Sequence, residues 1–342
     1  GAYQNGAVTM RSHSGLVVDG STFNVNHHAG SAMFLQPNTT YDIRLTLTDP
    51  DGGGTTTTIQ ASTKAYPVES TNYQYVAPGN GGGNGTSANP YLGLQAAADN
   101  AQPGITFIVR PGTYTPFNVA TNGTANAPIT FRSETLHAAI VDGGNTSSGV
   151  IVLGDFTTDS LQHIIIDGFK IQNGNYGIDA QHTQFITIKN CWIEDVVWGF
   201  YNRRENGWEH DQYLTNNYIK GRADWLNGGT SHRGIDIRGN RNVVSFNTIK
   251  NFDDGVSTDG PPYVLSYAMD IHNNDIQNMA DDLVEVDGTV SNTRVYRNRI
   301  YNGRAGVSLA PVFGGPCYVF RNEMYNMQEG YSTYKMNRGP SG

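Results

Sequence analysis

Short alternations of apolar and polar residues recur along most of the chain. Each alternation opens on a Gly or a Leu, and apolar side chains follow at every second position, as in Gly234-Ile-Asp-Ile-Arg. The segments begin at Gly149, Gly177, Gly199, Gly234, Gly255, Leu283, Gly306 and Gly330. A period of two residues predicts short strands with one buried face. Because consecutive segments begin 21 to 35 residues apart, the chain is predicted to repeat one small structural unit.

An asparagine recurs with a similar spacing of 24 to 30 residues. It lies two residues before an Ile or a Met at Asn217, Asn247, Asn274, Asn298 and Asn322. Short strands, Gly- and Asn-rich turns and this period are typical of a parallel β-helix, in which each repeat forms one coil. Equivalent residues of neighbouring coils stack about 4.8 Å apart, so the inward amides are predicted to hydrogen-bond one another in a ladder. Cys191 occupies the ladder position one coil earlier and is predicted to be buried and inert.

The first 104 residues follow a different pattern. Residues 35–63 alternate apolar and polar positions, turn at Asp49-Pro-Asp-Gly52 and alternate again, which predicts a β-hairpin. This hairpin resembles the last strands of a fibronectin type III domain, so residues 1–66 are interpreted as a partial, sandwich-like module of that type. Residues 67–104 are interpreted as a Gly-rich linker and a short amphipathic helix, in residues 91–100, that covers the end of a solenoid.

The remaining chain, residues 105–342, resembles the right-handed parallel β-helix proteins. The resemblance rests on Gly104-Ile-Thr-Phe-Ile-Val-Arg-Pro-Gly-Thr-Tyr114, on Ile140-Val-Asp-Gly143 and on Asp281-Asp-Leu-Val-Glu-Val-Asp-Gly288. That group holds pectate lyases, polygalacturonases, alginate and chondroitin lyases, and phage tailspikes. The resemblance therefore implies an all-β solenoid, a polysaccharide as partner, and a secreted, extracellular protein. The last unit has no cap of the kind a solenoid needs, so either the chain is truncated there or another molecule is expected to cover this end.

Composition narrows the classes of partner. With 30 acidic against 22 basic residues the net charge is −8, and no basic cluster is present that would bind nucleic acid through its phosphates. No apolar run approaches the ~20 residues that span a bilayer, so membrane insertion is not expected. The first residues, Gly1-Ala-Tyr-Gln4, lack the basic and apolar regions of a signal peptide, as expected of a mature secreted chain. An anionic ligand would need positioned Arg residues or a bound cation.

Side chains between the apolar positions are predicted to point outward. From coil to coil they form two columns: Asp179, Tyr201, Asp236, Ser257, Glu285, Ser308 and Ser332, and beside them Gln181, Arg203, Arg238, Asp259, Asp287, Ala310 and Tyr334. Like charges stacked at this spacing destabilise a sheet, so the middle coils are predicted to bind a cation or a substrate. The alternative is a mixed-charge ladder in which Arg238 pairs with Asp236 and Asp259.

A calcium-assisted polysaccharide lyase is the preferred hypothesis for this charged face. Ca²⁺ binds carboxylate oxygens, and the predicted metal ligands are Asp236, Asp259, Glu285 and Asp287. The bound ion would neutralise the carboxylate of a uronate, and Arg238 or Arg203 would remove the proton at C5. The predicted catalytic residues are therefore Arg238, Asp259, Glu285 and Asp287. Such a site resembles that of calcium-dependent pectate lyases, where acidic residues and an Arg share one face.

Two other hypotheses remain open. A glycoside hydrolase would use two carboxylates: Asp259 and Asp287 at about 5 Å suit a retaining enzyme, and Asp236 and Glu285 at about 9 Å an inverting one. A non-catalytic adhesion or surface-structure protein would use the solenoid as a rigid stalk.

Aromatic and basic residues near the same face are candidates for binding the glycan. They are Tyr201, Arg203, Trp208, Trp225, Arg304 and Tyr334. Trp208 and Trp225 lie beside or within the longest insertion, residues 221–233, and are expected to stack on sugar rings, while His210 or His232 would offer a base there. The pairs Asp253-Asp254 and Asp281-Asp282 are interpreted as turn caps.

Overall fold

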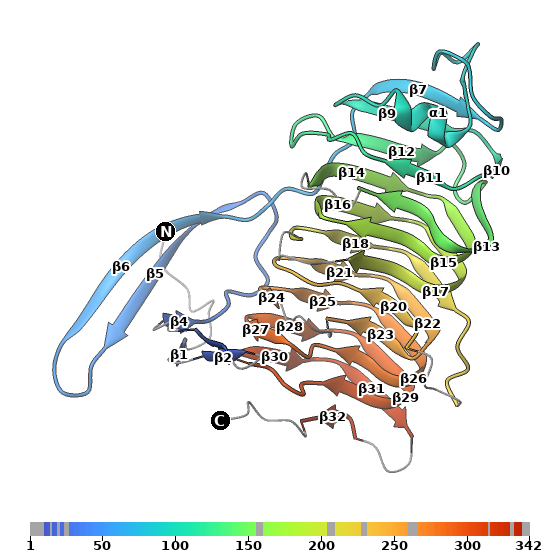
Figure 1. Cartoon of the computed structure of the whole chain (residues 1–342). Helices are drawn as coiled ribbons and strands as arrows, with labels where there is room; N and C mark the ends of the chain where they lie inside the picture. The colour runs from blue at the N-terminus through green and yellow to red at the C-terminus, as the bar shows by residue number, and fades with distance from the viewer. Residues whose placement is uncertain are drawn as a thin grey trace.

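The coils of this protein stack along one axis (Figure 1). The structure is a computed structural model, and it describes residues 10–13, 16–18, 21–23, 27–154, 160–203, 209–226, 231–258, 266–313, 315–328 and 332–336. In these residues the strands of each coil pair in parallel with those of the next. The predicted all-β class and parallel β-helix are confirmed.

One wall of the solenoid is an eleven-stranded sheet. In spatial order its strands are β30 (Cys317–Phe320), β28 (Thr293–Tyr296), β25 (Asp270–His272), β21 (Val243–Ser245), β18 (Tyr213–Thr215), β16 (Thr183–Lys189), β14 (Leu161–Asp167), β12 (Ile129–Ser133), β9 (Ile105–Val109), β7 (Asn72–Ala77) and β8 (Tyr91–Leu92). Equivalent positions stack, so that Leu214 pairs with Ile188 on one side and with Val244 on the other. All three side chains are buried, so each coil covers the apolar interior of the next.

The other wall is a thirteen-stranded sheet. Its main path is β10 (Gly112–Tyr114), β13 (Ala139–Leu153), β15 (Lys170–Gln181), β17 (Trp192–Arg203), β19 (Tyr218–Gly221), β22 (Thr248–Phe252), β26 (Asp275–Glu285), β23 (Asp254–Ser257) and β20 (Arg233–Asp236). Beside this path pair β11 (Phe117–Val119), β29 (Arg299–Ser308), β31 (Glu323–Met327) and β32 (Tyr334–Lys335). The predicted inward column, from Ile178 and Phe200 to Val284 and Val307, stacks inside this sheet. A short pair, β24 (Ser266–Tyr267) and β27 (Thr289–Ser291), adds to the coils.

The glycines that open the strands of this sheet are required by the close approach of the coils. A Cβ atom at Gly199 would lie 2.3 Å from the backbone oxygen of Gly234, and one at Gly234 would lie 2.6 Å from that of Gly255. Such contacts leave no room for a side chain. The repeated Gly of the sequence pattern therefore marks the positions where neighbouring backbones meet.

A short helix, α1 (Leu94–Asp99), lies at the first coils of the solenoid (Figure 1). Its residues Leu94, Ala97 and Ala98 are buried in the hydrophobic core. Strands β7 and β8 on either side of the Gly-rich stretch already belong to the eleven-stranded sheet. The first coil thus begins before residue 105. No helix in the described parts of the chain is both long and apolar enough to cross a membrane.

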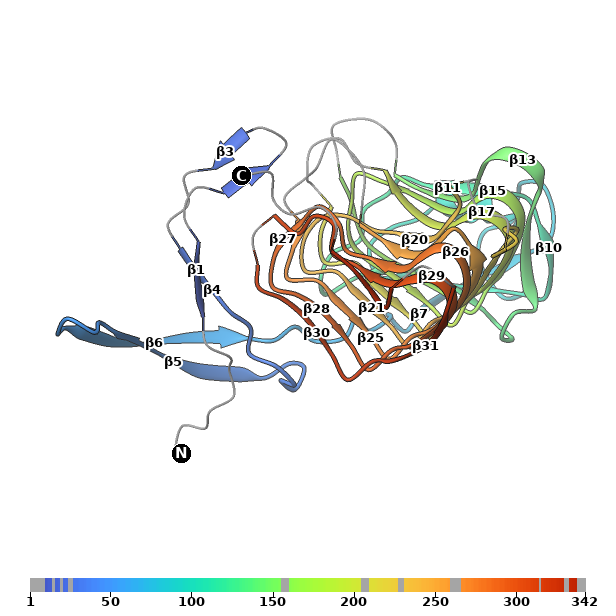
Figure 2. The ribbon, with the colours of Figure 1, turned by 90° about the horizontal axis from the view of Figure 1, so that it is seen from below.

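The predicted N-terminal hairpin is present as β5 (Thr40–Thr48) and β6 (Gly54–Ser62), which pair antiparallel. It projects from the flank of the solenoid, on the side opposite β10 (Figure 2). Ahead of it lie the antiparallel pairs β1 (Arg11–His13) with β4 (His27–Ala29) and β2 (Leu16–Val18) with β3 (Ser21–Phe23). As far as the structure describes this region, β5 and β6 pair only with each other. The fibronectin type III resemblance stays a prediction.

The asparagine ladder is confirmed bond by bond. The Nδ2 atom of Asn217 donates to Oδ1 of Asn247 at 2.9 Å, and the same bond joins Asn247 to Asn274 at 3.1 Å and Asn274 to Asn298 at 3.0 Å. Each Oδ1 also accepts the backbone N–H one coil earlier, and Cys191 donates in this way to Asn217. Burial raises the pKa of the Cys191 thiol to about 12, which keeps it protonated and inert, as predicted.

We expect Asn274→Ala to destabilise the solenoid by about 3 kcal/mol, because the change removes the acceptor shared by the buried backbone N–H and the side-chain amide of Asn247, and the side-chain donor to the carbonyl of Val244. The urea midpoint of unfolding measures the loss. Asn72→Ala, at an exposed position of β7, is the matched control and should change the midpoint little. Equal effects of the two substitutions would contradict a stabilising ladder.

Candidate functional site

The first predicted outward column stacks as the sequence indicates. Asp179 pairs with Tyr201, Tyr201 with Asp236, Asp236 with Ser257, and Ser257 with Glu285. These side chains point away from the apolar interior, and yet Asp236, Ser257 and Glu285 are buried, with at most 8% of their surface exposed. The predicted charged face is thus covered by its neighbours. Its ionisable groups must therefore compensate one another or bind a ligand.

The register of the last coil differs from the prediction. Ser308 pairs with Lys335 and Val307 with Tyr334, whereas the sequence pattern aligned Ser308 with Ser332. The pattern failed because Thr333, and not a Gly, lies opposite Gly306 in this coil. Tyr334 therefore stands beside an inward position and is 43% exposed, and Lys335 continues the charged column.

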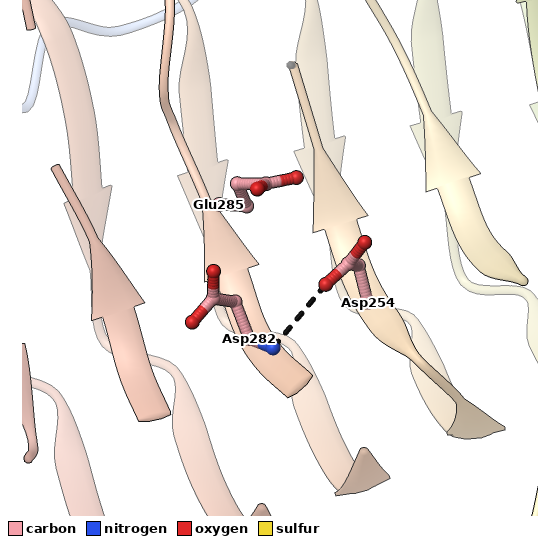
Figure 3. A group of neighbouring side chains, drawn as sticks. All are labelled: Asp254, Asp282 and Glu285. Atoms are coloured by element: carbon pink, nitrogen blue, oxygen red, sulfur yellow. Dashed lines mark hydrogen bonds between the residues drawn. The ribbon is translucent and has the colours of Figure 1, made fainter. Parts of the chain in front are cut away.

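Three carboxylates meet on neighbouring coils of the thirteen-stranded sheet. Asp254 opens β23, and Asp282 and Glu285 lie in β26, so that one ligand oxygen from each is within 4.8 Å of the others (Figure 3). The backbone N–H of Asp282 donates to Oδ1 of Asp254 at 3.2 Å, as the dashed line in Figure 3 marks. We name these three residues the acidic triad. All three are buried.

Two basic residues compensate the acidic triad in part. Arg233 lies with Nε 3.3 Å from Oδ2 of Asp254 and with Nη2 3.8 Å from Oε2 of Glu285. Lys335 places Nζ 2.7 Å from Oδ2 of Asp282. The second oxygen of Asp282, Oδ1, is buried and has no hydrogen-bond partner in the described part of the chain. A buried carboxylate oxygen without a partner is costly, and a cation would satisfy it.

The pKa values of the triad reflect this crowding. Burial raises the pKa of Asp254 to about 7 although Arg233 opposes the shift, and the charges of Asp282 and Asp281 raise it further. Burial likewise raises the pKa of Asp282 to about 6 against the opposing contact with Lys335. The pKa values are raised because buried carboxylates that share one site repel one another when they are ionised. A hard cation, which binds oxygen ligands, would relieve that repulsion. These residues therefore fit a divalent cation.

The other predicted metal ligands have different partners. Asp236 accepts from Arg238 Nε at 3.2 Å and from Arg233 Nη1 at 3.2 Å, as the alternative mixed-charge ladder predicted for Arg238 and Asp236. Asp287 accepts from Ser308 Oγ at 2.9 Å and from the backbone N–H of Ala310 at 2.6 Å. Neither carboxylate belongs to the acidic triad. Asp259 lies outside the described residues.

The predicted substrate-binding residues are spread around this region. Tyr201 stacks on Tyr176 at 5.0 Å and packs against Trp198 at 4.7 Å, and the guanidinium of Arg233 lies 5.7 Å from the Trp198 ring. An aromatic cluster therefore adjoins the acidic triad through Arg233. Among the other predicted positions, Trp225 is half-buried, and Arg304 lies 3.9 Å from Asp281. Arg203 ends β17, and its side chain is not among those the structure describes. Trp208 lies outside the described residues.

Sequence reasoning interpreted Asp254 and Asp282 as turn caps, but both lie in strands. One signal could have identified them. The pairs Asp253-Asp254 and Asp281-Asp282 are separated by the offset that pairs Val256 with Val284. Two Asp-Asp pairs one coil apart must stack.

Comparisons with known proteins agree with this architecture. No family model matches the sequence. Protein YwoF of Bacillus subtilis is 31% identical over 113 residues, which are 32% of this chain and 24% of YwoF. The pectate lyase PEL9 of Emericella nidulans is 29% identical over 139 residues, 34% of this chain and 33% of PEL9. The chain thus spans about a quarter to a third of the length of these curated relatives.

A solved structure extends the likeness to most of the chain. The pectate lyase Pel9A aligns with a TM-score of 0.55 at 17% identity, and the alignment covers 80% of each chain. The two proteins thus share the parallel β-helix fold, and at this identity the likeness concerns the path of the backbone.

We expect the metal-free protein to lose stability through Asp282 as the pH rises from about 4 to 7. Its folded pKa of about 6 lies above the ordinary value of 3.8 for an Asp, so the folded state binds the proton more tightly. That stabilisation is fully present below the unfolded pKa and is lost as the pH rises through the folded pKa. Asp282→Asn removes the dependence, worth about 2 kcal/mol.

The measurement compares urea midpoints of wild type and Asp282→Asn at several pH values in the presence of a chelator. The wild-type midpoint should fall relative to that of the variant across this range. Asp195→Asn, at an exposed ion pair with Arg222, is the control and should track the wild type. Parallel curves for wild type and Asp282→Asn would contradict the raised pKa.

Proposed function

We propose that this protein is a secreted polysaccharide lyase that cleaves a uronate-containing glycan by β-elimination, with a divalent cation, Ca²⁺ in the first place, at the acidic triad. The observation that carries the proposal is the convergence of Asp254, Asp282 and Glu285, together with the unpartnered Oδ1 of Asp282. The likeness of the fold to a pectate lyase supports it. Glu285 is retained from the sequence-based ligand set, and Asp254 and Asp282 are added.

In this mechanism the acidic triad would hold the cation, whose charge would neutralise the uronate carboxylate and so acidify the proton at C5. A base removes the C5 proton, the electron pair forms the C4–C5 double bond, and the bond from C4 to the glycosidic oxygen breaks. The leaving oxygen takes up a proton from water. This elimination needs a base that can exist without its proton near the triad.

Lys335 is the proposed base. An Arg cannot be deprotonated in a protein, whereas a Lys shifts its pKa readily, so Arg238 is better suited to hold Asp236 and to bind the glycan. Burial alone would lower the pKa of Lys335, but the hydrogen bond and charge of Asp282 outweigh burial and raise it. A cation held by Asp282 would weaken this raising influence. Lys335 would then lose its proton to solvent and be able to accept the proton from C5.

Two of the carboxylates predicted as ligands, Asp236 and Asp287, have supporting roles in this proposal. Asp236 fixes Arg233 and Arg238 beside the triad. Asp287 anchors the next coil through Ser308 and Ala310. Asp259 stays a predicted ligand. Tyr201 is proposed to line the glycan site with Arg238, because its ring belongs to the cluster that contacts Arg233.

We expect the protein to release unsaturated products from polygalacturonate or alginate, followed by their ultraviolet absorbance, and a chelator to abolish the release until Ca²⁺ is restored. Asp282→Asn should lower the rate at least about 100-fold, while Asp195→Asn should leave it unchanged. Reducing ends without unsaturated product would instead indicate the hydrolase. No cleavage across a broad glycan panel would favour the non-catalytic stalk.

We expect Lys335→Arg to lower kcat about 10³-fold, because the variant retains a positive charge beside Asp282 but cannot accept a proton. KM should change little. Lys250→Arg, which lies over the Tyr218 ring on the thirteen-stranded sheet, is the matched control. A fully active Lys335→Arg variant would place the base elsewhere.

A further inference from the structure

A concave surface lies on the eleven-stranded sheet, whereas the acidic triad belongs to the thirteen-stranded sheet. Residues 63–71, which connect β6 to β7, and the outer side of the coils enclose a cavity of about 1170 Å³. We name it the flank groove. The rings that line it belong to Tyr66, His163, Phe185, Tyr213, Phe246 and His272.

Rings in the flank groove meet from coil to coil. His163 stacks on Phe185 with centroids 4.5 Å apart, and Tyr66 stacks on Tyr213 at 5.6 Å. Phe246 contacts His272 edge to face at 5.8 Å. Phe246 is 54% exposed and Tyr66 is 60% exposed. The exposed parts of these two rings therefore present apolar surface within the groove.

The flank groove also contains polar groups that lack partners. Gln212 is 1% exposed, and its Nε2 donates to Thr183 Oγ1 at 3.0 Å. Its Oε1 has no hydrogen-bond partner among the described residues, and neither does the buried Nδ1 of His272. Both side chains line the groove. An unpaired buried acceptor is satisfied by a ligand that brings hydroxyl groups.

Charges in the flank groove are already paired with one another. Asp211 binds Arg241 at 2.9 Å and also Lys64 from the connecting segment. Asp270 holds Arg294 through two bonds of 2.7 Å. Charge-assisted pairs of this kind fix the side chains and leave their remaining donors and acceptors in place for neutral hydroxyl groups. The described charges of the groove are therefore compensated within it, and recognition rests on its rings and on its unpartnered polar atoms.

We propose that the flank groove binds a linear polysaccharide chain whose sugar rings lie along the solenoid axis. A pyranose ring has an apolar face that stacks on an aromatic ring and hydroxyl edges that suit Gln212 and His272. The groove is lined by residues of successive coils, from Ile165 to Tyr296, so a chain that fills it follows the solenoid axis. The ligand class follows from the groove itself and does not require the acidic triad to be catalytic.

Affinity electrophoresis of the whole chain tests this proposal, in native gels that contain polygalacturonate, alginate or a neutral xylan. An Asp282→Asn background keeps the polymers intact. We expect at least one polymer to retard the protein, and the double variant Tyr66→Ala, Phe246→Ala to weaken that retardation at least tenfold. Because both rings are more than half exposed, the urea midpoint should stay close to that of the parent.

Tyr325→Ala is the matched control, because Tyr325 is 49% exposed and stacks on Tyr301 on the thirteen-stranded sheet. Its retardation should equal that of the parent. No retardation in any gel, or equal retardation of the double variant, overturns the proposal and leaves the groove as the seat of residues 63–71 only. Retardation lost in the double variant would uphold the groove even if the protein with an intact triad forms no unsaturated product in the separate absorbance assay, so failure of the lyase proposal and failure of the groove proposal are distinguishable.

Discussion

Parallel stacking in register is the constraint on which this structure depends. Each residue has an equivalent about 4.8 Å above and below it, so a side chain that suits one coil must suit its copies. Apolar columns meet this condition simply, as Leu214 does between Ile188 and Val244. An inward polar group meets it only when its donor faces an acceptor in the next coil, and the amide of Asn provides both. The asparagine ladder therefore depends on the regular stacking of the coils, and it stabilises that stacking in turn.

The same constraint brings the carboxylates of the acidic triad together. Asp254 and Asp282 are one coil apart, so the backbone register alone places their charges in contact. Arg233 and Lys335 offset part of that repulsion, and they approach from different coils. The stacked like charges are unfavourable in themselves, and the proposed cation would relieve them. The aromatic cluster around Trp198 holds Arg233 in place beside it.

The repeat pattern was sufficient to predict the coils, the ladder and the first outward column, because those depend on spacing alone. It was insufficient for Asp254 and Asp282: a local pattern sees an Asp-Asp pair as a turn, and only the offset between two pairs shows that they stack. The position of Lys335 depends on the register of the last coil, in which Thr333 takes the place of the Gly that precedes the equivalent strands. Burial of the charged column could not be predicted either, since it depends on the neighbours Arg233 and Trp198 more than on the strand itself.

The place of Lys335 has a consequence for the dynamics of the site. In a solenoid each coil is stabilised by its nearest neighbours, and β32 is a two-residue strand that pairs with β29 alone among the described strands. Local opening of such a strand requires far less free energy than global unfolding. The ammonium that covers Asp282 is therefore carried by an element that detaches readily. Under the proposed function, brief opening of β32 would let a dissolved metal ion replace the Lys335 ammonium at Asp282, while the coils that hold Asp254 and Glu285 remain closed.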